Sequence, residues 1–125
     1  MEIRKRKILI IDDEIDLATT LKFRLEVNNF DVDFACDPMD GILKATTAKP
    51  ELILLDLTMP LMNGYQVCQK LKSDKNTAGI PIIILTAMAD EASARQALKA
   101  GAQGYLAKPF EAEALLFTVR KILKA

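Results

Sequence analysis

Four short apolar runs of this sequence each lead into a polar side chain that could take part in chemistry. These side chains are Asp12 with its neighbour Asp13, Asp56, Thr86 and Lys108. If the runs are neighbouring strands of a parallel sheet, their carboxyl ends meet at one edge, where ligands bind in such folds. The sequence therefore predicts one site that combines three carboxylates, a hydroxyl and an amine.

The three carboxylates of Asp12, Asp13 and Asp56 would repel one another in a partly desolvated pocket, and a bound cation would relieve that repulsion. The chain has no histidine, so oxygen ligands are left, and a small number of carboxylates suits Mg²⁺. Lys108 is expected to add a second positive charge on the opposite side of Asp56. A nucleophile, a metal and a neutralising lysine are what phosphoryl transfer requires. We therefore expect Asp56 to form an aspartyl phosphate.

Each of these residues also has an ordinary structural interpretation. Asp12 and Asp13 could cap the helix that follows them, and Asp56 could be a loop carboxylate. Thr86 could simply end a strand, and Lys108 could be a surface lysine. Their shared position at strand ends favours the site, because independent accidents would rarely place them all there.

The elements that must position these residues alternate along the chain. Apolar runs predict strands at residues 8–11, 31–35, 51–55, 81–85 and 103–106. Helical spacing predicts helices at residues 14–28, 38–49, from the loop 58–64 to about 73, 90–100 (with Gly101 as its C-cap) and 111–123. Five strand–helix units predict one α/β domain over residues 1–125. We expect a doubly wound five-stranded parallel sheet with helices on both faces and flavodoxin-like strand order, in which the alternating second run is an edge strand.

Composition narrows the classes of function. Seventeen basic and seventeen acidic residues balance, which argues against direct nucleic-acid binding, and the basic run 4–7 is interpreted as a solvated lead-in. Cys36 and Cys68 form no CxxC motif and are expected to be buried reduced thiols rather than zinc ligands. No run approaches the roughly 20 apolar residues of a membrane span, and the first is too short for a signal peptide. We therefore expect a cytoplasmic protein without direct membrane contact.

Four motifs together resemble the response-regulator receiver family of two-component signalling, including chemotaxis regulators. They are Asp-Asp-Glu (12–14), Leu-Leu-Asp-Leu-Thr-Met-Pro (54–60), Leu-Thr-Ala (85–87) and Tyr-Leu-Ala-Lys-Pro-Phe (105–110). The resemblance covers nearly the whole chain in the right order. It implies a phosphoacceptor that receives its phosphoryl group from a histidine kinase or histidine phosphotransfer protein and signals to a downstream effector domain or protein. Beyond self-phosphotransfer and autodephosphorylation, it implies no enzyme activity.

The resemblance also implies a division of roles at the metal. Asp13 and Asp56 would ligate Mg²⁺ directly, and Asp12 would act largely through water. The backbone carbonyl of Thr58 would complete the protein's share of the ligands.

The remaining roles concern the phosphoryl group and the switch. Thr86 would hydrogen-bond the phosphoryl group and Lys108 would pair with it, and the bond between Lys108 and Pro109 would be cis. Tyr105 stands where the family places its aromatic switch residue. Thr86 would move toward the phosphoryl group and leave space that the ring of Tyr105 can enter.

The family also bears on output and on phosphate lifetime. The signalling face would be the fourth helix, fifth strand and fifth helix, with Arg95 and Lys99 exposed on it; a homodimer through this face has no sequence feature of its own. Thr58 and Met88 lie two residues after Asp56 and Thr86. Because methionine cannot orient water by a strong hydrogen bond, we expect slow autodephosphorylation.

Three alternatives remain open at this point. An aspartate-nucleophile phosphatase would carry a second aspartate where Thr58 stands. A pseudo-receiver that never takes phosphate would not need the intact set of acidic, hydroxyl and amine residues. A flavodoxin-type nucleotide binder would need a phosphate-binding loop, and the glycines form no GxGxxG or P-loop.

Overall fold

The computed structural model describes residues 5–59, 62–87 and 90–124. Its strands are β1 (Arg6–Ile11), β2 (Phe30–Ala35), β3 (Leu52–Asp56), β4 (Ile82–Thr86) and β5 (Gly104–Ala107). Its helices are α1 (Ile15–Glu26), α2 (Pro38–Ala48), α3 (Gly64–Ser73), α4 (Glu91–Lys99) and α5 (Ala112–Leu123). Strands and helices alternate from end to end, as the hydrophobic pattern predicts.

All five strands are parallel, in the order β2-β1-β3-β4-β5. This is the predicted doubly wound, flavodoxin-like arrangement, and it is confirmed. The strand that alternates in sequence, β2, lies at an edge, with Val32 buried and Asp31 and Asp33 exposed. The two strands β3 and β4 are buried along their whole length, which explains why their sequences are apolar up to their last residues, Asp56 and Thr86.

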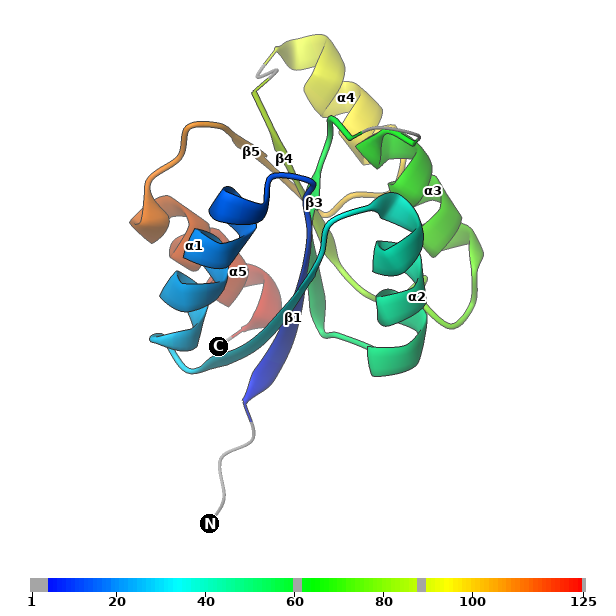
Figure 1. Ribbon diagram of the computed structural model, residues 1–125. Coiled ribbons are helices and arrows are strands. Elements are labelled where there is room, and N and C mark those ends of the chain that lie inside the picture. Colours follow the sequence, from blue (N-terminus) through cyan, green and yellow to red (C-terminus); the bar gives the residue numbers. More distant parts are fainter. Residues whose placement is uncertain (1–4, 60–61, 88–89, 125) are drawn as a thin grey trace.

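Helices cover both faces of the sheet (Figure 1). One hydrophobic cluster joins one face of the sheet to α2, α3 and α4, and a second joins the other face to α1 and α5. Successive strand residues divide between them: Leu9 and Ile11 enter the first cluster, and Ile8 and Ile10 enter the second. The period of two residues along a strand therefore serves both layers at once.

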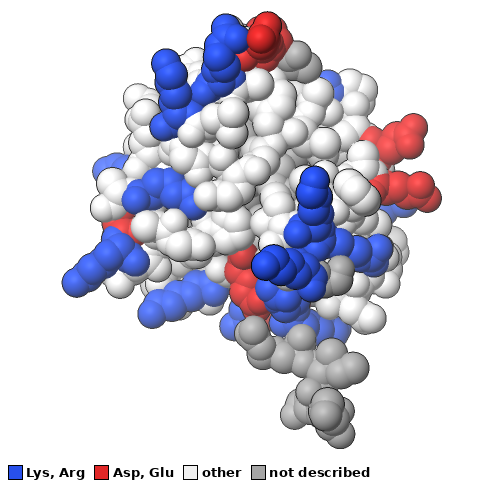
Figure 2. Space-filling model, turned by 180° about the vertical axis from the view of Figure 1, so that it is seen from behind, with Lys and Arg blue, Asp and Glu red and all other residues white. Residues whose placement is uncertain are grey.

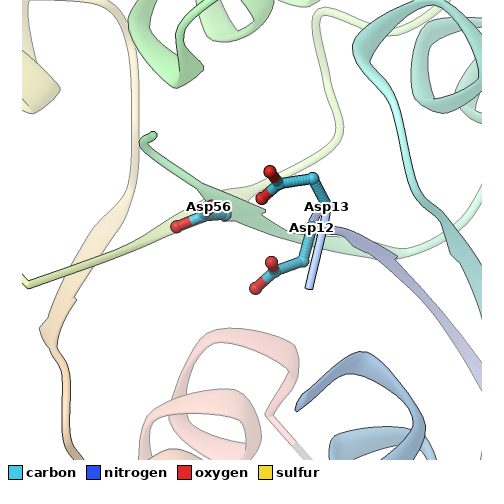
Figure 3. A group of neighbouring side chains, drawn as sticks. All are labelled: Asp12, Asp13 and Asp56. Carbon is cyan, nitrogen blue, oxygen red and sulfur yellow. The ribbon is translucent and has the colours of Figure 1, made fainter. Parts of the chain in front are cut away.

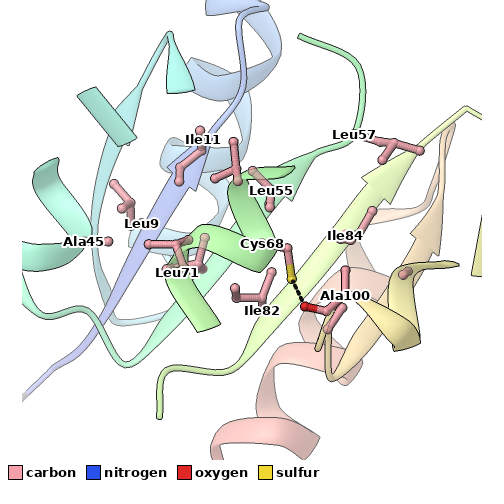
Figure 4. Packing of buried hydrophobic residues seen from close by; sticks show 14 of the residues in the cluster. Leu9, Ile11, Ala45, Leu55, Leu57, Cys68, Leu71, Ile82, Ile84 and Ala100 are labelled. Atoms are coloured by element: carbon pink, nitrogen blue, oxygen red, sulfur yellow. Dashed lines mark hydrogen bonds between the residues drawn. The ribbon is translucent and has the colours of Figure 1, made fainter. Parts of the chain in front are cut away.

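In the first cluster α3 packs on the sheet, with Ala100 at the end of α4 beside it (Figure 4). Cys68 is fully buried there, and its thiol lies 3.3 Å from the backbone oxygen of Ala100, to which it donates. Cys36 is only half-buried, so the prediction that both thiols are buried is wrong for this residue. It follows directly after the edge strand β2, where less of the protein covers the chain.

Helix ends differ from the predictions by one or two residues. Helix α1 ends at Glu26 and is capped by Val27, whereas the sequence pattern continues to residue 28. Helix α4 is capped by Ala100, and Gly101 is the residue after the cap, with φ of 102°. Glycine adopts this left-handed backbone conformation without the steric cost that a Cβ would bring.

Basic and acidic side chains balance in number, 17 of each. The face opposite to that of Figure 1 shows more basic than acidic side chains, with a group of Lys and Arg in its lower part and a largely uncharged area above it (Figure 2). In the described part of the chain, no helix has the length and apolar character needed to cross a bilayer.

Candidate functional site

The order of the strands brings the predicted site residues to one edge of the sheet. β1, β3, β4 and β5 are consecutive neighbours. In the register, Asp56 is paired with Leu85, and Thr86 is paired with Ala107, the residue before Lys108. The carboxyl ends of all four strands therefore meet at one place, as parallel pairing requires.

Asp12, Asp13 and Asp56 form an acidic cluster at this edge (Figure 3). One carboxylate oxygen from each residue lies within 4.8 Å of the other two. Asp12 is fully buried and Asp56 is 5% exposed, whereas Asp13 is open to solvent. An oxygen-only donor set with one open side fits a hard cation that keeps part of its water shell, as Mg²⁺ does.

The amine of Lys108 lies among these carboxylates. Its Nζ is 3.1 Å from Oδ1 of Asp56, 3.2 Å from Oδ2 of Asp12 and 3.8 Å from Oε1 of Glu14. The sequence predicts the amine of Lys108 on the opposite side of Asp56. In the structure this amine also contacts Asp12. The physical reason is reach: β5 is separated from β3 by β4, and the long side chain of lysine crosses the end of β4 to both acids.

Burial and crowding shift the pKa values of this cluster. Burial raises the pKa of Asp56 to about 6, helped by the nearby charge of Asp12 and opposed by Lys108. Burial also raises the pKa of Asp12. Burial acts to lower the pKa of Lys108, but the charges of Asp12 and Asp56 outweigh it and raise that pKa. The charge of Lys108 thus only partly neutralises the carboxylates, and this favours the binding of a further cation.

Asp12 also has a structural role. Its Oδ1 accepts the backbone N–H of Glu14 at 2.9 Å, just before α1 begins, and its own N–H donates to the carbonyl of Ala35 at 3.0 Å. The ordinary interpretation of this aspartate as a cap of the first helix is wrong, because the N-cap of α1 is Glu14 and no described side chain caps the start of this helix. One carboxylate oxygen holds the backbone of Glu14 ahead of α1, and the other contacts Lys108.

The start of α3 packs directly on the backbone of Asp56, a contact that the sequence analysis missed. The N–H of Gly64 donates to the carbonyl of Leu57 at 2.7 Å. A Cβ on Gly64 would lie 2.6 Å from the backbone oxygen of Asp56 and 2.7 Å from Cα of Leu57. Only glycine permits this approach. The Asn63-Gly64 pair, a typical turn dipeptide, was the available sequence signal.

The other predicted site residues surround the cluster. Thr86 is buried, and its carbonyl accepts the N–H of Lys108 at 2.7 Å. Thr58 is exposed in the segment after β3. Tyr105 is half-buried and packs against the cluster under α3 and α4. The peptide bond between Lys108 and Pro109 is cis.

The residues predicted for output and phosphate lifetime are placed less centrally. Arg95 and Lys99 are exposed on α4. Arg95 also pairs with Glu91, one turn earlier, at 3.2 Å. Met88 lies outside the described residues.

Comparison with known families gives one domain match. The model of the response regulator receiver domain matches residues 8–120. The DNA-binding dual master transcriptional regulator RpaA of Synechocystis is 40% identical over 118 residues, which is 94% of this chain and 49% of that protein. The response regulator ArlR of Staphylococcus aureus is 41% identical over 118 residues, or 94% of this chain and 52% of that protein. The chain thus spans about half the length of these curated relatives.

Solved structures agree with the sequence matches. The chemotaxis protein CheY4 of Vibrio cholerae superposes with a TM-score of 0.91 at 28% identity, covering 95% of this chain and 99% of that one. The BeF3-activated DrrB receiver domain superposes with a TM-score of 0.87 at 25% identity, covering 98% and 100% of the two chains. The similarity therefore extends over the whole fold.

Proposed function

From the premise that this chain belongs to the response regulator receiver domain family, we propose that Asp56 accepts a phosphoryl group in a Mg²⁺-dependent reaction. Receiver domains are signalling modules of two-component response regulators. The observation that carries the proposal is the surroundings of Asp56: a buried carboxylate with two further carboxylates within metal-binding reach and an amine at 3.1 Å. The domain in this proposal extends over residues 1–125.

The nucleophile is a carboxylate oxygen of Asp56. It attacks the phosphorus of a phosphohistidine on a sensor histidine kinase or histidine phosphotransfer protein. A new P–O bond forms as the P–N bond breaks, and the ring nitrogen leaves with the electron pair. The nucleophile needs no base, because a pKa of about 6 leaves this carboxyl mostly ionised at neutral pH. Lys108 is already beside Oδ1 of Asp56 and would pair with the charge of the transferred group.

Mg²⁺ would be held directly by Asp13 and Asp56, by Asp12 largely through water, and by the carbonyl of Thr58. It would supply positive charge against the carboxylates and the phosphoryl oxygens. The fit rests on the donor set: three carboxylates lie within reach of one ion, and one of them, Asp13, is open to solvent. The residues themselves contribute orientation, because β1 and β3 fix two of the acids at adjacent strand ends.

Phosphorylation would shift a conformational equilibrium. The hydroxyl of Thr86 would hydrogen-bond the phosphoryl group, and Tyr105 would enter the space that this movement leaves. The new charge biases the two states only by its different interaction with each. The altered face would comprise α4, β5 and α5, including Arg95 and Lys99, and would act on a downstream effector domain or protein.

The remaining parts of the proposal follow from this role. The domain works in the cytoplasm, contacts no nucleic acid itself and turns over no external substrate. The relatives RpaA and ArlR are about twice as long as this chain, so the output is proposed to lie in a part of the protein other than the receiver.

The test is intact mass spectrometry after incubation with acetyl phosphate and Mg²⁺. The wild-type protein should gain one phosphoryl group, and Asp56→Asn should not. Asp31→Asn, which removes an exposed carboxylate on the edge strand, is the matched control and should behave like the wild type. Equal labelling of the wild type and Asp56→Asn, or no labelling of the wild type by either acetyl phosphate or a phosphorylated histidine phosphotransfer protein, would contradict the proposal.

A further inference from the structure

A single hydroxyl joins the first turn of α3 to the first turn of α4. Tyr65 Oη donates to the backbone oxygen of Ser93 at 3.0 Å, across 28 residues of sequence. Tyr65 is partly buried against the same hydrophobic cluster that packs beneath both helices. The hydrogen bond therefore joins the two helices above the hydrophobic core, at the same end of the sheet as the acidic cluster.

Ser93, whose backbone oxygen accepts this hydrogen bond, makes a second hydrogen bond through its N–H. The N–H of Ser93 donates to Oδ1 of Asp90, the N-cap of α4, at 2.7 Å. Ser93 is 7% exposed. Within the described residues, the start of α4 is thus held by hydrogen bonds of its own cap and by the bond from Tyr65, which depends on another element of the fold.

Tyr65 is also coupled to the backbone of Asp56. Its neighbour Gly64 lies against the backbone of Asp56 and Leu57, with no room for a Cβ. A capping box between Asn63 and Gln66 fixes the first turn of α3 at this point. A displacement of the backbone at Asp56 must therefore move the turn that carries Tyr65.

A second aromatic residue lies near the same end of α4. Burial raises the pKa of Tyr105, and the nearby Asp90 and Tyr65 raise it further. The two tyrosines of the chain and the N-cap of α4 thus lie within electrostatic range of one another. A movement of Tyr105 would take place beside the bond that holds Ser93.

We propose that Tyr65 is a positioning residue whose hydroxyl holds α4 in its resting arrangement. It forms a second connection between Asp56 and α4, through the start of α3 rather than through Thr86 and Tyr105. The switching role of this connection rests on the proposed phosphorylation of Asp56. Loss of the hydroxyl should raise the population in which α4 is released, and a larger competent population is phosphorylated faster.

The variant for the test is Tyr65→Phe, which keeps the packed ring and removes the donor. Thr77→Val is the matched control: the buried Thr77 hydroxyl donates to the carbonyl of Leu71 at 2.6 Å, at the opposite end of α3 from Tyr65. Like Tyr65→Phe, this variant loses one hydrogen bond from a side-chain hydroxyl to a backbone carbonyl. If the two variants lose similar amounts of thermal stability, any difference between them at α4 is not due to general destabilisation.

The first measurement is amide hydrogen exchange without any phosphodonor. In Tyr65→Phe, the amides of α4 should exchange about fivefold faster than in the wild type, as expected for the loss of one net hydrogen bond. Those of α2 should not change. Thr77→Val should leave α4 as in the wild type. Equal protection of α4 in Tyr65→Phe and wild type, or equal acceleration in both variants, would overturn the proposal.

The second measurement is the rate of phosphorylation by acetyl phosphate with Mg²⁺, which should rise several-fold in Tyr65→Phe and stay unchanged in Thr77→Val. An unchanged rate in Tyr65→Phe overturns the coupling. The two arms separate the hypotheses: a wild type that takes no phosphate contradicts the proposed function, whereas the exchange measurement tests the hold on α4 without any phosphorylation.

Discussion

Lys108 Nζ lies 3.1 Å from Oδ1 of Asp56, although 52 residues separate them in the sequence. The same amine contacts Asp12 at 3.2 Å. The lysine therefore compensates two buried carboxylates at once, and its removal affects both.

Lys108→Met should destabilise the metal-free protein near pH 7 by about 2–3 kcal/mol, because loss of one partner leaves buried charge unpaired. Urea unfolding measures the change. The double variant Lys108→Met with Asp56→Asn should recover part of the loss. The control Lys22→Met removes an exposed pair with Glu26 and should cost less than about 1 kcal/mol. Equal effects of the two lysine substitutions would contradict the role of Lys108.

The raised pKa of Asp56 predicts a pH-dependent gain of stability in Asp56→Asn. Because the pKa in the folded protein is about 6 against an ordinary 3.8, the folded state binds this proton more tightly than the unfolded chain does. The favourable contribution is complete below pH 3.8 and is lost as the pH rises through 6.

Asp56→Asn should therefore be more stable than the wild type by about 1–2 kcal/mol above pH 7, in the presence of a chelator, with little difference near pH 4. Thermal unfolding across this range gives the comparison. A constant difference at every pH would show that the carboxyl does not titrate as described. Added Mg²⁺ should reduce the gain, because a cation favours the ionised wild-type carboxylate.

Gly64→Ala should disturb the site from its backbone side. The added methyl group would meet main-chain atoms of Asp56 and Leu57, which cannot move away as a flexible side chain can. We expect a loss of about 2 kcal/mol or more in unfolding free energy and slower phosphorylation. Gly79→Ala is the control, since a Cβ there has no neighbour within 4 Å. If both variants unfold at the same urea concentration, the close packing of Gly64 on the backbone of Asp56 does not contribute to stability.

Asp13→Asn should weaken Mg²⁺ binding by about tenfold or more, since the loss of one ligand charge at close range costs at least about 1.4 kcal/mol. Isothermal titration calorimetry of the phosphate-free protein measures the affinity directly. Asp13 is the exposed member of the cluster, so its substitution should leave folding almost unchanged. Unaltered Mg²⁺ affinity would remove Asp13 from the ligand set.

Met88→Glu should shorten the lifetime of the aspartyl phosphate. A carboxylate can hold water by hydrogen bonds, and a thioether holds it poorly. The decay of the phosphorylated mass after removal of the phosphodonor measures the hydrolysis rate. Identical decay curves for variant and wild type would refute the link between Met88 and slow hydrolysis.

The order of elements and the identity of the residues at the sheet edge could be predicted from the sequence. Buried parallel strands have nearly continuous apolar sequences, as in the four residues that precede Asp56. In a doubly wound sheet, residues that follow such strands must lie at its carboxyl edge. The positions of Asp12, Asp56 and Thr86 follow from this rule, because they depend on the backbone alone. The exact helix ends did not follow, since a cap such as that of α4 depends on one residue's backbone conformation.

Contacts made by side chains across the fold were decided only by the tertiary structure. Lys108 reaches Asp12 as well as Asp56 because its strand lies two places from β3 and its side chain spans the gap. Tyr65 meets Ser93 because α3 and α4 pack over one hydrophobic cluster. Periodicity in a sequence reports which face of an element is buried, whereas the partner of a hydroxyl or an amine depends on how separate elements pack in three dimensions.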